Sequence, residues 1–82
     1  MVTVYILQGE KRRYVGITND LLRRLREHAG SSHSGRLIGK FTVLHTEEFG
    51  SHAEARVREK FLKSGQGREW LSRKFPRVKP AR

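Results

Sequence analysis

The amino-acid sequence predicts an α+β fold: a small three-stranded antiparallel sheet flanked by helices, in the order β-β-α-β-α-α. Three short blocks are rich in β-branched and aromatic residues, which is the composition of strands. Three other blocks repeat apolar residues at the spacing of helices. Because three short strands alone bury little apolar surface, we expect the helices to pack against the sheet. The length of 82 residues suffices for one domain with a small core.

The first part of the chain is expected to form a hairpin followed by a helix. Residues 2–7 and 13–18 have strand composition, and the short polar link between them predicts an antiparallel hairpin. The Thr, Asn and Asp side chains at 18–20 are typical of a helix start. Leucines at helical spacing then predict a helix from about Asp20 to His28, with a glycine as its stop.

A loop and a third strand are expected next. Residues 31–40 contain Ser, Gly and Arg and predict a loop, whereas Phe41–Phe49 has the composition of a strand. The chain has no internal repeat and no linker long enough to divide it. We therefore expect one domain at 1–75 and a basic, frayed tail at 76–82.

Two helices are expected in the last part of the chain. Ser51 is followed three residues later by Glu54, which matches the capping box of a helix start. The helix is predicted to run to about Lys63, with Gly65 as its stop. A final short helix is predicted at about Arg68–Lys74.

The net charge of +10, from 18 Lys and Arg against 8 Asp and Glu, favours a polyanionic partner. Nucleic acid is the first candidate. An anionic membrane is disfavoured, because no apolar run approaches the roughly 20 residues of a spanning helix and no signal peptide is apparent. With no cysteine and four histidines that lack paired spacing, a structural zinc site is not expected. This composition is compatible with a cytoplasmic protein, and we expect a monomer.

Two tyrosines and one helix stripe are the first candidate functional residues. Tyr5 and Tyr14 lie on strands that are predicted to pair, so the register decides whether they meet. Asp20, Arg24 and His28 follow at positions i, i+4 and i+8, and so share one stripe of the helix. Each also has a structural interpretation. The tyrosines suit a core, Arg24 suits an ion pair with a carboxylate of its own helix, and His28 suits the helix C-terminus.

Gly16 and Glu59 are further candidates. Gly16 removes a side chain near the end of the second strand, where a backbone or a ligand can approach closely. Glu59 lies on the helix after the third strand, between basic neighbours. Its structural alternative is an i, i+4 ion pair with Lys63. Trp70 is expected to anchor the last helix in the core.

Taken together, the order and spacing of these strings resemble the GIY-YIG nuclease superfamily, over roughly residues 2–73. Within it, the chain is most similar to small stand-alone bacterial and phage members. The strings that carry the resemblance are Val4–Leu7, Tyr14–Leu21, Arg23–His28, Ala55–Gly65 and Gly67-Arg68.

The resemblance implies a role for each matching residue. Tyr5 corresponds to the tyrosine of the first motif, and Tyr14 and Gly16 correspond to the tyrosine and the glycine of the second motif. Arg24 takes the helix arginine and His28 a histidine that some members use. The glutamate that binds one divalent cation, Mg²⁺ or alternatively Mn²⁺, is Glu59.

The chain also departs from the family pattern. Thr3-Val4 stands where the first motif has Gly-Ile, and Val15 stands for an isoleucine in the second. Many members have an asparagine late in the domain, but the only asparagine here is Asn19, and Gln66 is the candidate replacement. This departure bears on the substrate side of the site more than on the metal.

These residue types suit phosphodiester hydrolysis. A carboxylate that holds hydrated Mg²⁺ neutralises the leaving group, and an arginine donates to the scissile phosphate. We expect Tyr5 to accept the proton of the attacking water and Tyr14 to orient water or phosphate. The exchanged assignment and a proton relay through His28 stay open. A phenol needs cationic neighbours to act as a base near neutral pH.

The sequence thus predicts a metal-dependent endonuclease acting on DNA, with little sequence specificity and a preference for DNA structure, in DNA repair or recombination. RNA is an alternative substrate, and a catalytically weak or inactive DNA- or RNA-binding module is the alternative function. An adaptor for an acidic protein is a third hypothesis. The expected substrate-binding residues are Gly16, Lys11, Arg13, Arg23, Lys63 and Arg68.

Overall fold

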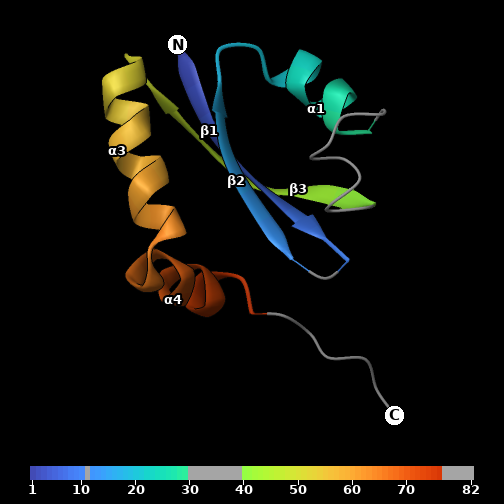
Figure 1. Ribbon diagram of the computed structural model, residues 1–82, viewed down its shortest axis with the longest axis vertical. Helices are drawn as coiled ribbons and strands as arrows, with labels where there is room; N and C mark the ends of the chain where they lie inside the picture. The colour runs from blue at the N-terminus through green and yellow to red at the C-terminus, as the bar shows by residue number, and fades with distance from the viewer. Residues whose placement is uncertain (11, 30–39, 77–82) are drawn as a thin grey trace.

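The computed structural model describes residues 1–10, 12–29 and 40–76, and it confirms the predicted α+β fold. The sheet has the order β2-β1-β3, and β1 pairs antiparallel with both neighbours (Figure 1). The expected loop at 31–40 and tail at 76–82 lie almost wholly outside the described residues. The elements are β1 (Val2–Gly9), β2 (Arg13–Thr18), α1 (Leu21–Ala29), β3 (Phe41–Phe49), α3 (His52–Lys63) and α4 (Gly65–Lys74).

One face of the sheet is covered by α1. The register places Tyr5 opposite Gly16 and Leu7 opposite Tyr14, so both tyrosines share this face. Tyr5 and Leu7 are the fully buried residues of a small core, against which α1 packs with two of its leucines. Figure 1 shows α1 on one side of the sheet and α3 on the other.

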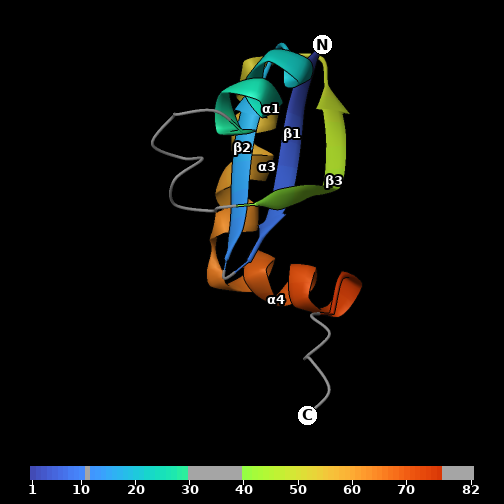
Figure 2. The same ribbon diagram turned by 90° about the vertical axis from the view of Figure 1, so that its right-hand side faces the viewer.

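The opposite face carries the main apolar core. Alternation along β1 turns Val2, Val4 and Ile6 toward α3 and α4, where Leu62 and Leu71 are buried. In Figure 2, α3 lies behind the sheet and α4 runs across its lower end. The result is three layers, in which the sheet separates the tyrosine-containing face from the main core.

The predicted helix starts at Asp20 and Ser51 are confirmed. An Asp20 Oδ1 atom accepts from the backbone N–H of Arg23 at 3.2 Å, and the Ser51 hydroxyl accepts from that of Glu54 at 3.3 Å. The prediction for the last helix was wrong at its start, because α4 begins at Gly65 rather than near 68. The Ser64 hydroxyl caps it by accepting from the Gly67 N–H at 3.2 Å.

An ion-pair network ties β3 to the helices. Glu47 accepts from Arg58 at 2.8 and 3.1 Å, and lies 2.9 Å from the ring of His45. These partners hold the pKa of Glu47 below its usual value, although burial acts in the opposite direction and is the largest single influence. The Arg58 guanidinium also lies 4.8 Å from the centre of the Trp70 ring, which packs on the main core as expected.

None of the helices among residues 1–10, 12–29 and 40–76 is both long and apolar enough to cross a membrane.

Candidate active site beside a basic groove

Tyr5 is the buried centre of the candidate site. It lies on the middle strand and its exposed fraction is 0%. Its hydroxyl is 3.0 Å from Nε2 of His28, which α1 carries over the sheet. The Tyr14 ring lies 6.1 Å from the Tyr5 ring and 4.8 Å from the His28 ring. Three residues that are distant in sequence therefore form one aromatic and polar cluster.

Gly16 leaves the space in which the two tyrosines meet. A Cβ atom at this position would lie 2.5 Å from the Tyr5 hydroxyl oxygen and 3.0 Å from Cε1 of Tyr14. Both distances are shorter than, or at the limit of, ordinary carbon contacts. Gly16 is thus required for the close approach of the rings, which agrees with the sequence hypothesis that a side chain is removed here.

Arg24 brings a positive charge to the Tyr5 hydroxyl. Burial raises the pKa of Tyr5, and the hydrogen bond from Arg24 acts in the opposite direction. The pKa of Arg24 is raised by Tyr5 and by Glu27, whose carboxylate it contacts at 3.0 Å. Arg24 therefore pairs with a carboxylate of its own helix, as its structural interpretation expects, and it also reaches the tyrosine cluster.

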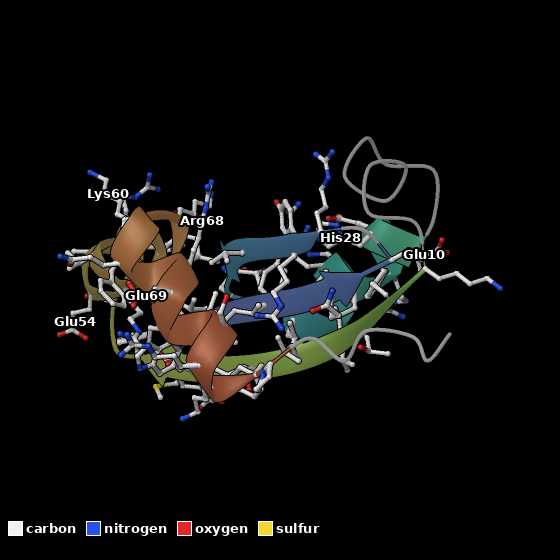
Figure 3. All side chains as sticks on the ribbon, turned by 90° about the horizontal axis from the view of Figure 1, so that it is seen from below. Glu10, His28, Glu54, Lys60, Arg68 and Glu69 are labelled. Atoms are coloured by element: carbon white, nitrogen blue, oxygen red, sulfur yellow. The ribbon has the colours of Figure 1, made fainter. Side chains whose placement is uncertain are left out.

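His28 is a buried imidazole whose pKa lies below its usual value. Its exposed fraction is 3%, and burial, together with the charge of Arg24, lowers its pKa. Its Nδ1 atom is buried and has no hydrogen-bond partner among the described residues. Figure 3 shows His28 between α1 and the sheet rather than on an outer surface. A relay through His28 would run through its Nε2 atom and Tyr5.

Tyr14 is also one of the residues that line a groove between β2 and the C-terminal helices, although its ring packs on the α1 face of the sheet. The groove has a volume of about 620 Å³ and is open to solvent on one side. Its floor contains apolar side chains and its rim carries four cations. The lining residues are Arg12, Arg13, Tyr14, Val15, Leu62, Lys63, Arg68, Leu71 and Ser72. Tyr14 is the residue that belongs to both the groove and the tyrosine cluster.

Glu59 lies on α3, which packs against β2 and β1 from the face opposite α1. Its side chain has an exposed fraction of 16%, and Lys63 donates to it at 3.2 Å. The structural alternative for Glu59, an i, i+4 pair, is therefore present. Among residues 1–10, 12–29 and 40–76, no three His, Asp or Glu side chains gather as a metal cage. One partly buried carboxylate does fit Mg²⁺, because this ion keeps most of its waters.

The expected substrate-binding residues fall into separate places. Lys63 and Arg68 line the groove. Arg13 also lines it, but its guanidinium donates to Gln8 at 2.6 Å and to the carbonyl of Phe75. Arg23 lies on α1 and pairs with carboxylates of that helix, away from the groove. Lys11 lies outside the described residues.

Sequence reasoning counted Arg12 only among the basic residues of which some were expected on a phosphate-binding face, and it gave Ser72 and Val15 no role in a groove. Arg12 joins its rim, Ser72 lies on its wall, and Val15 belongs to its apolar lining. The sequence does contain a signal for Arg12, because a cation next to a predicted strand is a common feature of phosphate-binding surfaces. The wall formed by α4 depends on where that helix starts, and the glycine at its first turn suggested a helix stop instead.

Comparison with known proteins gives two matches. A family model described as the GIY-YIG catalytic domain matches residues 1–71. The chain also resembles the UPF0213 protein of Bacillus halodurans, whose structure was solved by solution NMR, with 33% sequence identity and a TM-score of 0.56. This similarity covers 92% of the present chain and 86% of the other. No curated protein matches the chain.

Proposed function

We propose a function from one premise: this chain belongs to the GIY-YIG family. Membership supports a nuclease-type function with DNA as substrate. Our more specific proposal is a divalent-metal-dependent endonuclease that hydrolyses a phosphodiester bond at the rim of the basic groove, next to Tyr14. We assign the nuclease domain to residues 1–75 and treat 76–82 as a basic tail.

One observation carries the proposal: Tyr14 belongs both to the buried polar cluster and to the residues that line a groove rimmed by cations. A groove of this charge attracts a phosphate backbone, because cations that neutralise phosphates release condensed counterions. A phosphate in the groove would then lie next to Tyr14, whose ring is held in place by Tyr5 and His28. This preorganisation is what catalysis of a charged transition state needs.

The geometry favours Tyr14 over Tyr5 as the group that accepts the proton of the attacking water. Tyr14 is partly exposed and lines the groove, whereas Tyr5 is fully buried and its pKa is raised. A buried phenol cannot contact a water that lies in the groove. We therefore assign Tyr5 and His28 to positioning, since they hold Tyr14 and each other.

Arg24 supplies the positive charge of the cluster. Its guanidinium lies beside the Tyr5 hydroxyl and is partly exposed, so one side of it stays available to solvent and substrate. We assign it to the non-bridging oxygens of the scissile phosphate, where charge develops in the transition state. Removal of one such donor typically lowers the rate by about 10²–10³.

Glu59 is the residue we assign to Mg²⁺, with Mn²⁺ as an alternative. The ion would supply Lewis-acid stabilisation of the leaving oxygen. The chain's own part is to provide one carboxylate held by α3 at the side of β2. The Lys63 ammonium donates a hydrogen bond to that carboxylate. When the cation binds, the Lys63 side chain would have to turn away from Glu59 toward the phosphate.

We propose little sequence specificity and selection by DNA structure. One small domain offers little area for contact with base edges, and its groove cations suit phosphates rather than bases. RNA is the alternative substrate, because the same phosphate contacts serve both. The proposal also includes a monomeric cytoplasmic enzyme of DNA repair or recombination.

The test is a cleavage assay on labelled duplex, single-stranded, flapped and branched DNA with Mg²⁺ or Mn²⁺. Glu59→Gln and Arg24→Ala are expected to abolish cutting or reduce it by about 10² or more. Their matched controls are Glu54→Gln on the same helix as Glu59 and Arg26→Ala on the same helix as Arg24, both exposed. Equal activity of all four variants would overturn the proposal.

A DNA-binding module with weak or no catalysis is the second candidate function. The Glu59–Lys63 pair favours it, because a carboxylate engaged by an ammonium is less available to a cation. This candidate predicts that Glu59→Gln leaves DNA affinity unchanged and that wild type cuts none of the four substrates with either metal. Metal-dependent cutting that Glu59→Gln removes would exclude it.

A further inference from the structure

The cations of the described residues divide into paired and unpaired groups. On α1, Arg23 and Arg24 pair with carboxylates of the same helix. On the far side of the molecule, Arg58 and Arg73 are paired with glutamates. Local acids therefore reduce the positive charge at these places. The exposed cations without an ion pair among the described residues are Arg12, Arg26, Lys40, Arg56, Lys60, Arg68 and Lys74.

Two of these unpaired cations, Arg56 and Lys60, lie on α3 in line with Lys63, whose ammonium is paired with Glu59 at 3.2 Å. Arg56, Lys60 and Lys63 are spaced at i, i+4 and i+7, so they lie on the same face of the helix. Lys63 is also on the rim of the groove. Figure 3 shows Lys60 on α3 and Arg68 on α4 pointing to the same side of the molecule. This stripe of cations thus extends the positive charge of the groove rim along α3, beside Glu59.

We propose that Arg56 and Lys60 form a second phosphate-binding surface, on which the nucleic-acid backbone continues past the groove along α3. This inference rests on the proposed function, since it takes the groove as the place where the strand is cut. It adds phosphate contacts along α3 beyond those of the groove. We call this surface the α3 stripe and define it as Arg56, Lys60 and the shared rim residue Lys63.

The length of the α3 stripe suits a phosphate backbone. Seven residues of α-helix span about 10 Å at 1.5 Å per residue. A single strand of B-DNA presents one phosphate per 3.4 Å of axis, which is about three phosphates over the same length. Three cations therefore face about three phosphates. The outer face of α3 lacks the wide apolar surface of a membrane-lying helix, which leaves charge as its main means of recognition.

The test compares two double variants with equal loss of charge. Arg56→Gln with Lys60→Gln removes the unshared part of the α3 stripe. Arg26→Gln with Lys40→Gln removes two exposed, unpaired cations outside it. Binding to a labelled duplex is measured by anisotropy over a range of salt concentrations, with a chelator present so that no cleavage occurs. Circular dichroism checks that both variants fold.

The stripe variant is expected to change both affinity and salt dependence. Two lost phosphate contacts reduce the slope of log affinity against log salt by about 2, which corresponds to a loss of up to about 60-fold in affinity at 0.1 M salt. The control variant should keep the wild-type slope. Restoring charge with Arg56→Lys and Lys60→Arg should restore the slope, because a phosphate contact needs charge rather than one side-chain shape.

Cleavage then separates this inference from the proposed function. Under steady-state conditions the variant that lacks the Arg56 and Lys60 charges should raise KM and leave kcat unchanged, because neither side chain is paired with Glu59 or assigned to the reacting phosphate. A wild-type slope in the stripe variant would overturn the inference even if the enzyme cuts DNA. A reduced slope in a chain that never cuts would support the stripe and overturn the nuclease. Absence of DNA binding by wild type would overturn both.

Discussion

The substitution Gly16→Ala tests whether the tyrosine cluster is as closely packed as the structure indicates. A Cβ atom at position 16 would lie 2.5 Å from the Tyr5 hydroxyl oxygen and 2.7 Å from its Cζ atom. Tyr5 is fully buried and its hydroxyl is hydrogen-bonded to His28, so its ring cannot rotate into solvent. The added methyl group therefore has to displace β2, the Tyr5 ring or Tyr14.

Two opposing effects set the expected magnitude. Overpacking a well-packed site costs about 1–3 kcal/mol. Replacing glycine by alanine in a strand returns about 0.4–1 kcal/mol, because the unfolded chain loses freedom. Gly16 lies in an extended strand without the left-handed backbone that would itself require glycine, so this gain applies. The net expectation is a loss of about 1–2 kcal/mol, or roughly 4–16 °C in Tm for a domain of this size.

The effect is measured by urea denaturation of four proteins. These are wild type, Gly16→Ala, Tyr5→Phe and the double variant Gly16→Ala with Tyr5→Phe, and the free energy of unfolding is compared within each pair. Removing the hydroxyl oxygen relieves the closest contact, so Gly16→Ala should cost less in that background. The contact with Cζ stays and keeps some of the penalty. DNA cleavage by Gly16→Ala should also fall, because Tyr14 would move. A Gly16→Ala protein as stable as wild type, or an equal cost in both backgrounds, would refute the reasoning.

Two further predictions concern pH. The pKa of His28 is lowered in the folded chain, so the unfolded chain binds more protons below the ordinary histidine pKa, and stability should fall as the pH drops from 7 to 5. The urea midpoint is measured over this pH range for wild type, His28→Phe and the exposed control His52→Gln. His28→Phe should weaken the pH dependence and His52→Gln should not. The same pH dependence in all three proteins would contradict the prediction. The pKa of Glu47 is lowered by Arg58, so its stabilisation is complete above the ordinary glutamate pKa and is lost as the pH falls below it. Thermal melts between pH 6 and 3 should show a smaller acid loss for Glu47→Gln than for wild type, and an unchanged acid loss would count against the ion pair.

The sequence was sufficient for most of the secondary structure, because local signals and tertiary packing agree. The third strand begins and ends where its composition indicates, at Phe41–Phe49. The Ser51 cap and the end of its helix at Lys63 were also correct. The hairpin followed from two strand-like blocks around a short polar link, and its register was the part that sequence left open.

The start of α4 was wrong for a tertiary reason. A glycine normally weakens a helix, so Gly65 and Gly67 suggested a break. A Cβ atom on Gly67 would lie 1.9 Å from the Phe61 carbonyl oxygen, so glycine is required where the first turn of α4 crosses the end of α3. The residue is buried for this reason. No local rule distinguishes a glycine that stops a helix from one that lets two helices touch.

The candidate site was only partly readable for a similar reason. The resemblance to the GIY-YIG family implied that Tyr5, Tyr14, Arg24 and His28 belong to one site, and the structure brings these residues together. Their exposure was not readable, because it depends on which helix covers which face of the sheet. That placement is what turned our expectation about the proton acceptor from Tyr5 toward Tyr14.

The three-layer arrangement has a consequence for protein engineering. On the α1 face, the fully buried residues are Tyr5 and Leu7, so one of the two is also a residue of the candidate site. Repacking this half of the protein for thermostability would therefore also alter a residue of the candidate site. The face covered by α3 and α4 holds its aliphatic core apart from the tyrosines, with Val4, Ile6 and Leu62 among its members. A directed-evolution library that aims at higher thermostability should be confined to the core between the sheet and helices α3 and α4.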